Sequence, residues 1–172
     1  MNEPFPVKAR DKVKTRQELL EIISRLKRAG KRIVFTNGCF DLLHPGHVRY
    51  LEAARELGDI LVVALNSDDS VRRIKGEGKP FVHQSERAEM IGALCSVSFV
   101  TTFSEDTPQT LIEEILPDVL VKGGDWSRDQ IVGRETVVKN GGQVIAANFE
   151  KGFSTTGIVE RIRSGRKSDP VP

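Results

Sequence analysis

Short apolar runs and longer amphipathic stretches alternate along the chain. Five runs rich in apolar and β-branched residues predict strands at Arg32–Thr36, Ile60–Asn66, Ser96–Thr101, Val119–Lys122 and Gln143–Asn148. Apolar residues on a helical period predict helices at Thr15–Ala29, Pro45–Leu57, Ser85–Leu94, Pro108–Ile115, Gln130–Asn140 and Thr155–Arg163. Continuously apolar strands that alternate with helices are typical of a parallel sheet covered on both faces.

The pattern therefore predicts an α/β protein, with a Rossmann-like doubly wound parallel sheet of about five strands and helices on both faces. The 172 residues are enough for one domain with a substantial core, which we assign to residues 15–164. The polar, proline-bearing segments 1–14 and 165–172 are expected to be flexible. The Leu/Ile stripe of the first helix could cover the sheet or another subunit, so we expect a homo-oligomer.

Charge and composition narrow the class of partners. A formal net charge of +2 is too small to favour nucleic acid or a membrane surface. Apolar runs such as Ile60–Leu65 are far shorter than the roughly 20 residues of a membrane span. The chain does not start with a signal peptide, and its two cysteines have no metal-binding or CxxC spacing. We therefore expect a cytoplasmic protein with reduced thiols, and neither nucleic acid nor a membrane as partner.

The segment His44-Pro45-Gly46-His47 carries the main chemical signal. It follows the first strand and the turn Asn37-Gly38, and it begins a helix. Two imidazoles three residues apart share a helix face, and free N–H groups at the helix start attract phosphate. An isolated pair could be ordinary helix-start residues. At the carboxyl end of a strand, where doubly wound sheets bind ligands, the pair favours a nucleoside triphosphate site.

Other candidate residues have two interpretations each. Neither a G-x-G-x-x-G fingerprint nor a P-loop is present, so phosphate must be held in another way. Ser154, Thr155 and Thr156 begin the last helix, either as a plain N-cap or as an anion site. Lys75, in the glycine-flanked segment 72–80 that we expect to be mobile, is either solvated or closes over phosphates. Arg87, at a helix start, is either solvated or reaches the triphosphate.

The segment Asn37–His47 closely resembles the motif of the nucleotidyltransferase superfamily that includes the cytidylyltransferases. The resemblance implies that Gly38, Cys39 and Phe40 offer backbone N–H groups to phosphate, and that His44 and His47 contact the triphosphate. It gives Cys39 a backbone role, not that of a thiol nucleophile. Ser154–Thr156 resembles the family's G-I-S-T-[ST] motif. The preceding Phe149–Gly152 departs from its R-T-E-G, and Lys151 is the candidate to replace the missing arginine.

Three further segments resemble a narrower family, the D-glycero-β-D-manno-heptose 1-phosphate adenylyltransferases. They are Glu105–Pro108, Leu116–Trp126 and Gly133–Glu135, and the resemblance extends from about Thr15 to Arg163. Many relatives carry a fused sugar kinase, so this chain is expected to be a stand-alone form. Two glycines after the fourth strand allow close approach of a flat base. The resemblance places Gly124, Asp125 and Trp126 in the nucleoside pocket, although packing is the alternative for Trp126.

The resemblance implies transfer of AMP from ATP to heptose 1-phosphate, giving ADP-heptose and pyrophosphate for lipopolysaccharide core or other heptose-containing surface glycans. His44, His47 and Lys75 would be catalytic, and Lys75 would neutralise the incoming phosphate. Arg87 and Ser154–Thr156 would hold the pyrophosphate, and Asp41 and Lys122 would contact substrate. Mg²⁺ would be carried by ATP, with Asp41 as a possible carboxylate near it.

Two alternatives remain. One is a cytidylyltransferase that acts on glycerol 3-phosphate or a similar alcohol phosphate; the missing arginine and the Gly123-Gly124 pair argue against it. The other is a non-catalytic nucleotide-binding domain. The presence of both histidines, Lys75, Arg87 and the hydroxyl cluster in one chain argues against that.

Overall fold

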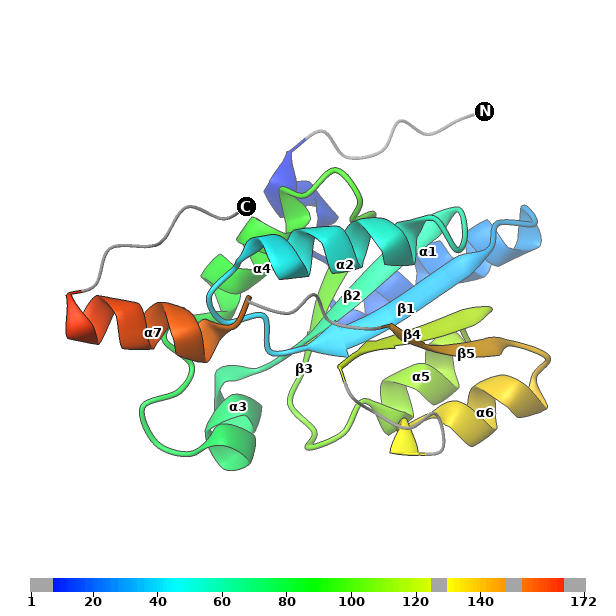
Figure 1. Cartoon of the computed structure of the whole chain (residues 1–172). Coiled ribbons are helices and arrows are strands. Elements are labelled where there is room, and N and C mark those ends of the chain that lie inside the picture. Colours follow the sequence, from blue (N-terminus) through cyan, green and yellow to red (C-terminus); the bar gives the residue numbers. More distant parts are fainter. Residues whose placement is uncertain (1–7, 125–129, 148–152, 166–172) are drawn as a thin grey trace.

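A computed structural model of the chain describes residues 8–124, 130–147 and 153–165. Five parallel strands form one sheet in the order β3-β2-β1-β4-β5 (Figure 1). They are β1 (Ile33–Gly38), β2 (Ile60–Asn66), β3 (Phe99–Phe103), β4 (Val119–Gly123) and β5 (Gln143–Ala147). The predicted parallel sheet is confirmed. β3 begins later than expected, because the Ser98 hydroxyl accepts the Leu61 N–H just before the strand.

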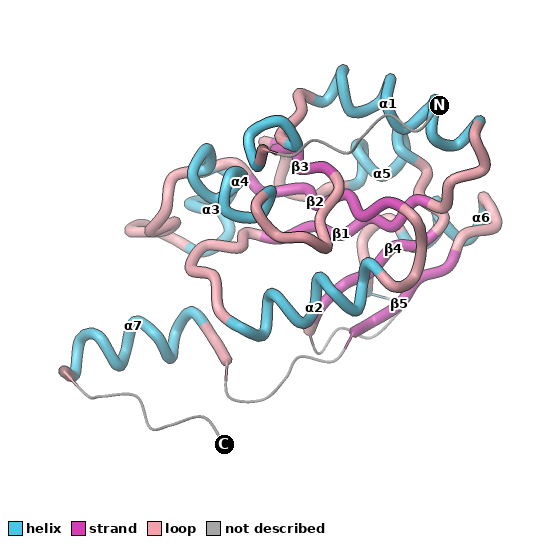
Figure 2. Tube along the Cα trace, turned by 90° about the horizontal axis from the view of Figure 1, so that it is seen from above, coloured by secondary structure: helices cyan, strands magenta, loops and turns pink. Residues whose placement is uncertain are grey.

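Helices cover both faces of the sheet (Figure 2). On one face, α1 (Arg16–Arg28), α5 (Gln109–Ile115) and α6 (Arg134–Lys139) pack on Ile33 and Phe35 of β1. On the other face, α2 (Pro45–Arg55) and α4 (Gln84–Gly92) pack on Val34. Because both faces are covered, buried residues follow one another along β1, β2 and β4 instead of alternating with exposed ones. The doubly wound fold class is therefore confirmed.

The stripe of α1 covers the sheet. Leu19 and Ile23 are buried in the core beneath α1, and the partly buried Leu20, Ile22 and Leu26 pack around them. A capping box fixes the start of this helix, since the Thr15 hydroxyl accepts from the Glu18 N–H and the Glu18 carboxylate accepts from the Thr15 N–H. The stripe therefore gives no support to an oligomer, which remains a prediction.

Three segments differ from the expectations. Residues 8–14, expected within a flexible segment, form a 3₁₀ helix, η1 (Ala9–Lys12), and a bridge between Val13 and Val100 of β3. The segment 72–80 is only partly a loop, because Ser67 caps α3 (Asp68–Lys75). α6 begins at Arg134 instead of Gln130, because Gly133 adopts a left-handed conformation (φ +87°) that ends the preceding turn.

A final helix, α7 (Thr155–Ser164), matches the prediction. Within the described ranges, no helix is long and apolar enough to cross a membrane.

Candidate active site

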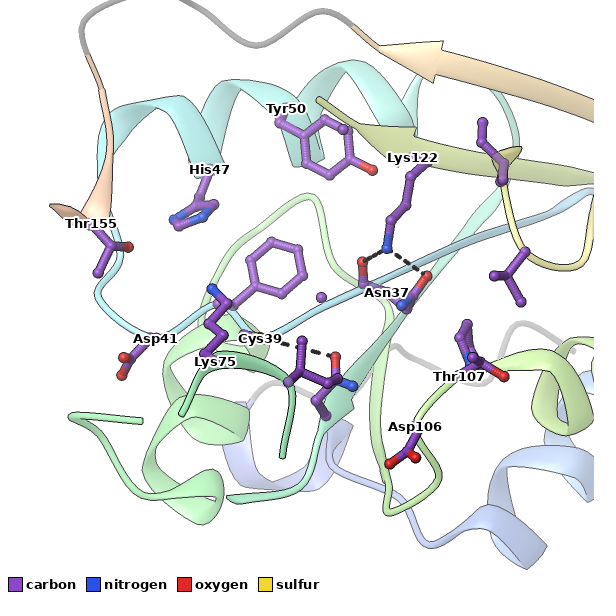
Figure 3. A pocket seen from close by; sticks show the side chains of 18 of the residues that line it. Asn37, Cys39, Asp41, His47, Tyr50, Lys75, Asp106, Thr107, Lys122 and Thr155 are labelled. Carbon is purple, nitrogen blue, oxygen red and sulfur yellow. Dashed lines mark hydrogen bonds between the residues drawn. The ribbon is translucent and has the colours of Figure 1, made fainter. Parts of the chain in front are cut away.

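A cavity of about 460 Å³ opens at the carboxyl ends of the central strands (Figure 3). Its floor is formed by Asn37 and Gly38 of β1, Asn66 of β2, and Lys122 and Gly123 of β4. Chain connections from β1 run outward to β2 and β3 on one side, whereas β4 and β5 lie on the other. This is the switch point where open α/β sheets bind ligands.

The structure brings most of the predicted site residues into this cavity. Those that line it are Gly38, Cys39, Phe40, Asp41, His47, Lys75, Lys122 and Thr155. Others do not line it: His44, Arg87, Gly124, Ser154 and Thr156. Asp125 and Trp126 lie outside the described residues, as does Lys151. Segments distant in sequence thus meet around one space.

The two histidines are stacked on each other at the start of α2. His44 is the N-cap residue, and Pro45 takes the first helical position, where a missing N–H costs nothing. The ring centroids of His44 and His47 are 3.8 Å apart with an interplanar angle of 18°. Among the described residues, neither Nδ1 atom has a hydrogen-bond partner, although both are buried. Buried polar atoms are normally paired, and His47 lines the cavity, so its unpaired Nδ1 atom is a candidate contact for a ligand.

Burial keeps both imidazoles neutral near pH 7. Desolvation is the main cause that lowers the pKa of His47 from 6.5 to about 4, followed by repulsion from a protonated His44 and from Lys75. Burial also lowers the pKa of His44. A neutral imidazole stacked on another can donate one N–H to a phosphate oxygen without the repulsion that two imidazolium ions would meet.

The loop after β1 presents its backbone to the cavity. Phe40 adopts a left-handed conformation (φ +44°), and its ring lies 5.1 Å from that of His47, centroid to centroid. A Cβ atom on Gly38 would come within 2.8 Å of the Phe40 ring, so this position requires glycine. The Cys39 thiol faces the Asn66 amide oxygen at 3.9 Å, which fits a backbone role for Cys39.

Asp41 lies in the middle of this loop and is almost fully buried. Its carboxylate accepts hydrogen bonds from the backbone N–H groups of Phe81 (2.8 and 3.0 Å) and Val82 (2.9 Å). Asp41 therefore ties the loop after β1 to the segment that precedes α4. It also lines the cavity, so a contact with substrate or metal remains a prediction.

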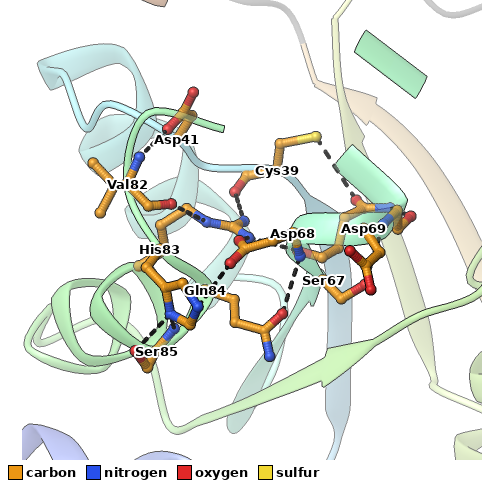
Figure 4. A network of polar contacts seen from close by, with 12 residues as sticks. Cys39, Asp41, Ser67, Asp68, Asp69, Val82, His83, Gln84 and Ser85 are labelled. Atoms are coloured by element: carbon orange, nitrogen blue, oxygen red, sulfur yellow. Dashed lines mark hydrogen bonds and ion pairs between the residues drawn. The ribbon is translucent and has the colours of Figure 1, made fainter. Parts of the chain in front are cut away.

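Arg87 is placed differently from our expectation. Its side chain is fully buried and donates to the carbonyl groups of Val82, Cys39 and Asn66 and to the Asp68 carboxylate (Figure 4). These four acceptors engage all three guanidinium nitrogens, so Arg87 braces the cavity from behind instead of pointing into it. The helix-start position suggested a phosphate contact, but the loops around α4 supply backbone acceptors that the sequence pattern did not reveal.

Lys75 and Thr155 enter the cavity from two different helices. Lys75 is the last residue of α3, and its charge acts on His47. Thr155 is the first residue of α7, and its hydroxyl lies 3.5 Å from the Leu42 carbonyl. Ser154 is the N-cap, since its hydroxyl accepts from the Gly157 N–H (3.0 Å). Of the predicted hydroxyl cluster, Thr155 is thus the member that faces the cavity.

Lys122 joins the ends of β4 and β1 at the switch point. Its ammonium group donates to the carbonyl and the side-chain oxygen of Asn37, at 3.3 and 3.2 Å. Burial lowers the pKa of Lys122. Beside it, the buried Tyr50 hydroxyl contacts Thr36 Oγ1 (2.6 Å) and the Val121 carbonyl (3.2 Å). Lys122 therefore has a structural contact in addition to its predicted contact with substrate.

The sequence did not reveal all of the residues that line the cavity. The missed residues are Asn37, Tyr50, Asn66, Ile74, Asp106, Thr107, Pro108, Gln130, Ile131 and Val132. Asn37 and Asn66 end apolar strands, and polar residues at those ends were the signal that could have found them. Asp106–Pro108 was noticed as a family segment but was not assigned to a site.

These features define a class of protein. A stacked histidine pair at the helix after β1, of which His47 lines the switch-point cavity, is combined there with a lysine and a helix-start hydroxyl, and this combination is typical of nucleotidyltransferases. The chain belongs to the cytidylyltransferase-like family, whose model matches residues 35–161.

Curated relatives agree with this assignment. The chain is 55% identical over 152 residues to the bifunctional protein HldE of Haemophilus ducreyi, and 55% identical over 151 residues to HldE of Geobacter sulfurreducens. The matches cover 88% of this chain in both cases, but only 32% and 31% of the relatives. The chain thus spans about a third of the length of these curated relatives.

Solved structures show the same fold. A lipopolysaccharide core biosynthesis protein from Thermoplasma volcanium is 30% identical, with a TM-score of 0.59, and matches over its whole length and 72% of this chain. The pantoate-beta-alanine ligase of Francisella tularensis is 15% identical, with a TM-score of 0.58, over 86% of this chain and 75% of that one. The second match bears on the fold alone.

Proposed function

We propose that the chain transfers AMP from ATP to D-glycero-β-D-manno-heptose 1-phosphate, giving ADP-heptose and pyrophosphate. The observation that carries the chemistry is the meeting of His47, Lys75 and Thr155 around one cavity at the start of α2. The nucleotide and the sugar rest on the resemblance of Glu105–Pro108 and Lys122–Trp126 to that enzyme family, and the identity with HldE proteins supports it. The match with the Thermoplasma volcanium protein supports a role in surface glycans.

The reaction is a single displacement at the α-phosphorus. A phosphate oxygen of the sugar phosphate bonds to the α-phosphorus, the bond to the α–β bridging oxygen breaks, and its electron pair leaves with pyrophosphate. His47 donates an N–H to the α-phosphate region, and Lys75 offsets the charge of the incoming phosphate. The N–H groups of Gly38–Phe40 and the hydroxyl of Thr155 hold phosphate oxygens. Catalysis then consists of positioning and charge stabilisation.

In-line displacement constrains how the two substrates lie in the cavity. The attacking oxygen must approach the phosphorus opposite to the leaving pyrophosphate. If Thr155 and the start of α7 hold pyrophosphate, the sugar phosphate enters from the other end, toward Asp106 and Thr107 (Figure 3). Hydroxyl, amide and carboxylate groups there suit a ligand rich in hydroxyl groups.

The carboxylates of the cavity bear on how Mg²⁺ would be held. Asp41 is engaged by Phe81 and Val82, and Asp106 forms an ion pair with Arg73 (2.7 Å). Within the described ranges, no three His, Cys, Asp or Glu side chains gather as a metal site. We propose that Mg²⁺ arrives with the triphosphate and that Asp41 is the carboxylate near it. Such an ion supplies positive charge along the leaving pyrophosphate.

One assay tests the proposal. Pyrophosphate release is measured with ATP or CTP against heptose 1-phosphate and glycerol 3-phosphate, and ADP-heptose is identified by mass. We expect release with ATP and heptose 1-phosphate. Release with CTP and glycerol 3-phosphate would replace the proposal with a cytidylyltransferase, and ATP binding without release for any pair would favour a binding domain. We also expect the protein in the cytoplasm, where its ATP is available.

A further inference from the structure

Phe153 is an aromatic residue that the proposed chemistry does not use. It directly precedes the cap of α7, and its ring lies nearly parallel to that of His44, with centroids 6.4 Å apart and an interplanar angle of 17°. The Arg49 guanidinium carbon lies 5.4 Å from the centre of the Phe153 ring. Together with the His44–His47 stack and Phe40, this forms a continuous row of rings from the helix surface to the cavity.

The absence of a side chain at Gly46 allows His44 and Phe153 to pack closely against α2. A Cβ atom at position 46 would lie 3.1 Å from His44 Nδ1 and 3.2 Å from the Phe153 Cβ atom. Both approaches are tighter than ordinary contacts, so the backbone of α2, His44 and Phe153 are packed against one another. The buried Nδ1 atom of His44 lies at this contact.

Helix α7 is attached through this region. None of its residues is buried, and Ile162 is 72% exposed. Phe153, just before the cap, contacts His44 and Arg49, and Thr155 in the first turn contacts the Leu42 carbonyl. Figures 1 and 2 show the rest of the helix extending away from the sheet. The same few residues therefore seat α7 and contact the histidine pair.

We propose that Phe153 is a positioning residue that holds the His44–His47 stack in its catalytic orientation and couples it to the seating of Thr155. The proposal rests on the proposed function for its kinetic consequence, but its structural part can be measured without substrate. Phe153 excludes water from the outer face of His44, and His44 in turn holds His47 against Phe40.

The charged groups around His44 and His47 determine the direction in which their pKa values should change. Lys75 faces His47 from α3, Arg49 of α2 lies over the outer face of Phe153, and the Asp41 carboxylate is engaged by Phe81 and Val82. Loss of the Phe153 ring admits water to His44, and relief of desolvation moves a histidine pKa upward.

The chain has only three histidines, so imidazole NMR titration can follow each one. In Phe153→Leu we expect the pKa of His44 and His47 to rise by about half a unit or more. Phe153→Tyr should keep the wild-type values. His83, which is 66% exposed on its side chain and pairs with Asp68, is the internal control, and Ile162→Ala is the control on α7. Unchanged values for both His44 and His47 in Phe153→Leu would overturn the proposal.

A general loss of structure would overturn it as well. That outcome would appear as a shift of all three histidines together with loss of cooperative unfolding, and it would make Phe153 an ordinary packing residue. If the NMR result stands but no substrate pair reacts, then the proposed function fails and the positioning role survives.

A kinetic cycle tests the coupling. In the wild-type background, Phe153→Leu should lower kcat about tenfold, as expected when a group acts through the orientation of another. In a His44→Ala background, the same change should have little further effect, because the residue through which it acts is gone. Equal effects in both backgrounds would contradict action through His44.

Discussion

Helices α4 and α2 begin at the same edge of the sheet, but the buried polar side chains at their starts differ in whether they have hydrogen-bond partners. At the start of α4, the buried Arg87 has an acceptor for each guanidinium nitrogen, from Val82, Cys39, Asn66 and Asp68. At the start of α2, the imidazoles of His44 and His47 keep buried Nδ1 atoms without a partner among the described residues. Both sets were expected to bind phosphate, but only His47 lines the cavity.

This difference distinguishes residues that stabilise the fold from residues that are available to bind a ligand. A buried group whose bonds are all satisfied stabilises the fold, and its removal leaves its partners unpaired. A buried group with an unused atom beside an open cavity costs stability and is retained for what it binds. Substitution of a residue of the first kind should therefore lower the free energy of unfolding. Substitution of a residue of the second kind should lower kcat.

The largest effect is expected for Arg87→Met. The substitution keeps most of the volume but leaves Asp68 and three carbonyl groups without their donor, which should cost about 3–5 kcal/mol of unfolding free energy. Urea denaturation followed by circular dichroism measures this. Arg72→Met is the matched control, because its partner Asp69 is 76% exposed. Equal stability of the two variants would mean that Arg87 is not a structural brace.

The next effect is expected for His47→Ala. Loss of one charge-stabilising donor typically lowers kcat by about 10²–10³. Because no protein bond to Nδ1 is lost, the free energy of unfolding should change far less than in Arg87→Met. Steady-state pyrophosphate release and urea denaturation measure the two quantities, with His83→Asn as a control for loss of a histidine outside the cavity. Near-normal turnover would refute the role of His47.

The third prediction concerns pH. Because the pKa of His47 is about 4 in the folded protein and 6.5 is its ordinary value, the unfolded chain binds more protons between these values. Stability should thus fall as the pH is lowered from about 6.5 toward 4, and His47→Gln should flatten that slope. Urea midpoints at several pH values measure the effect. An identical slope in the variant would mean that His47 is solvated.

The smallest effect is expected where an ion pair is exposed. Arg73 and Asp106 form a 2.7 Å pair whose side chains are 50% and 70% exposed. Exposed pairs contribute about 0–1 kcal/mol, so Arg73→Gln should barely change the urea midpoint. A loss as large as that in Arg87→Met would show that this pair is buried in solution and that Arg73 stabilises the fold as strongly as Arg87 does.

Much of the fold followed from the sequence because both faces of the sheet are buried. The apolar runs predict all five strands, with β3 alone clearly displaced, and the periodic stretches predict six of the helices. α3 was missed because Asp68–Lys75 is short and mostly polar, so its stability depends on the Ser67 cap more than on an apolar face. The ordered residues 8–14 were missed because their contacts with Leu94 and Val100 are distant in sequence.

The part of the site that lies in one continuous sequence motif was predictable. Residues 38–47 form one continuous segment, so a sequence pattern can describe it. The role of Arg87 was not predictable, because its acceptors come from three other segments of the chain. The missed wall at Asp106–Pro108 reaches the cavity through the pairing of β2 with β3 and through the contact of Asp106 with Arg73 of α3. Long-range pairing of this kind leaves no periodic signal.

The strand order also sets when the cavity can be completed during synthesis. β1 lies at the centre and must wait for β4, more than 80 residues later in the chain, to pair along its second edge. Thr155 arrives later still, with the last described helix. Strands β1 to β4 can therefore emerge from the ribosome before Thr155, so the side of the cavity that Thr155 lines is completed last.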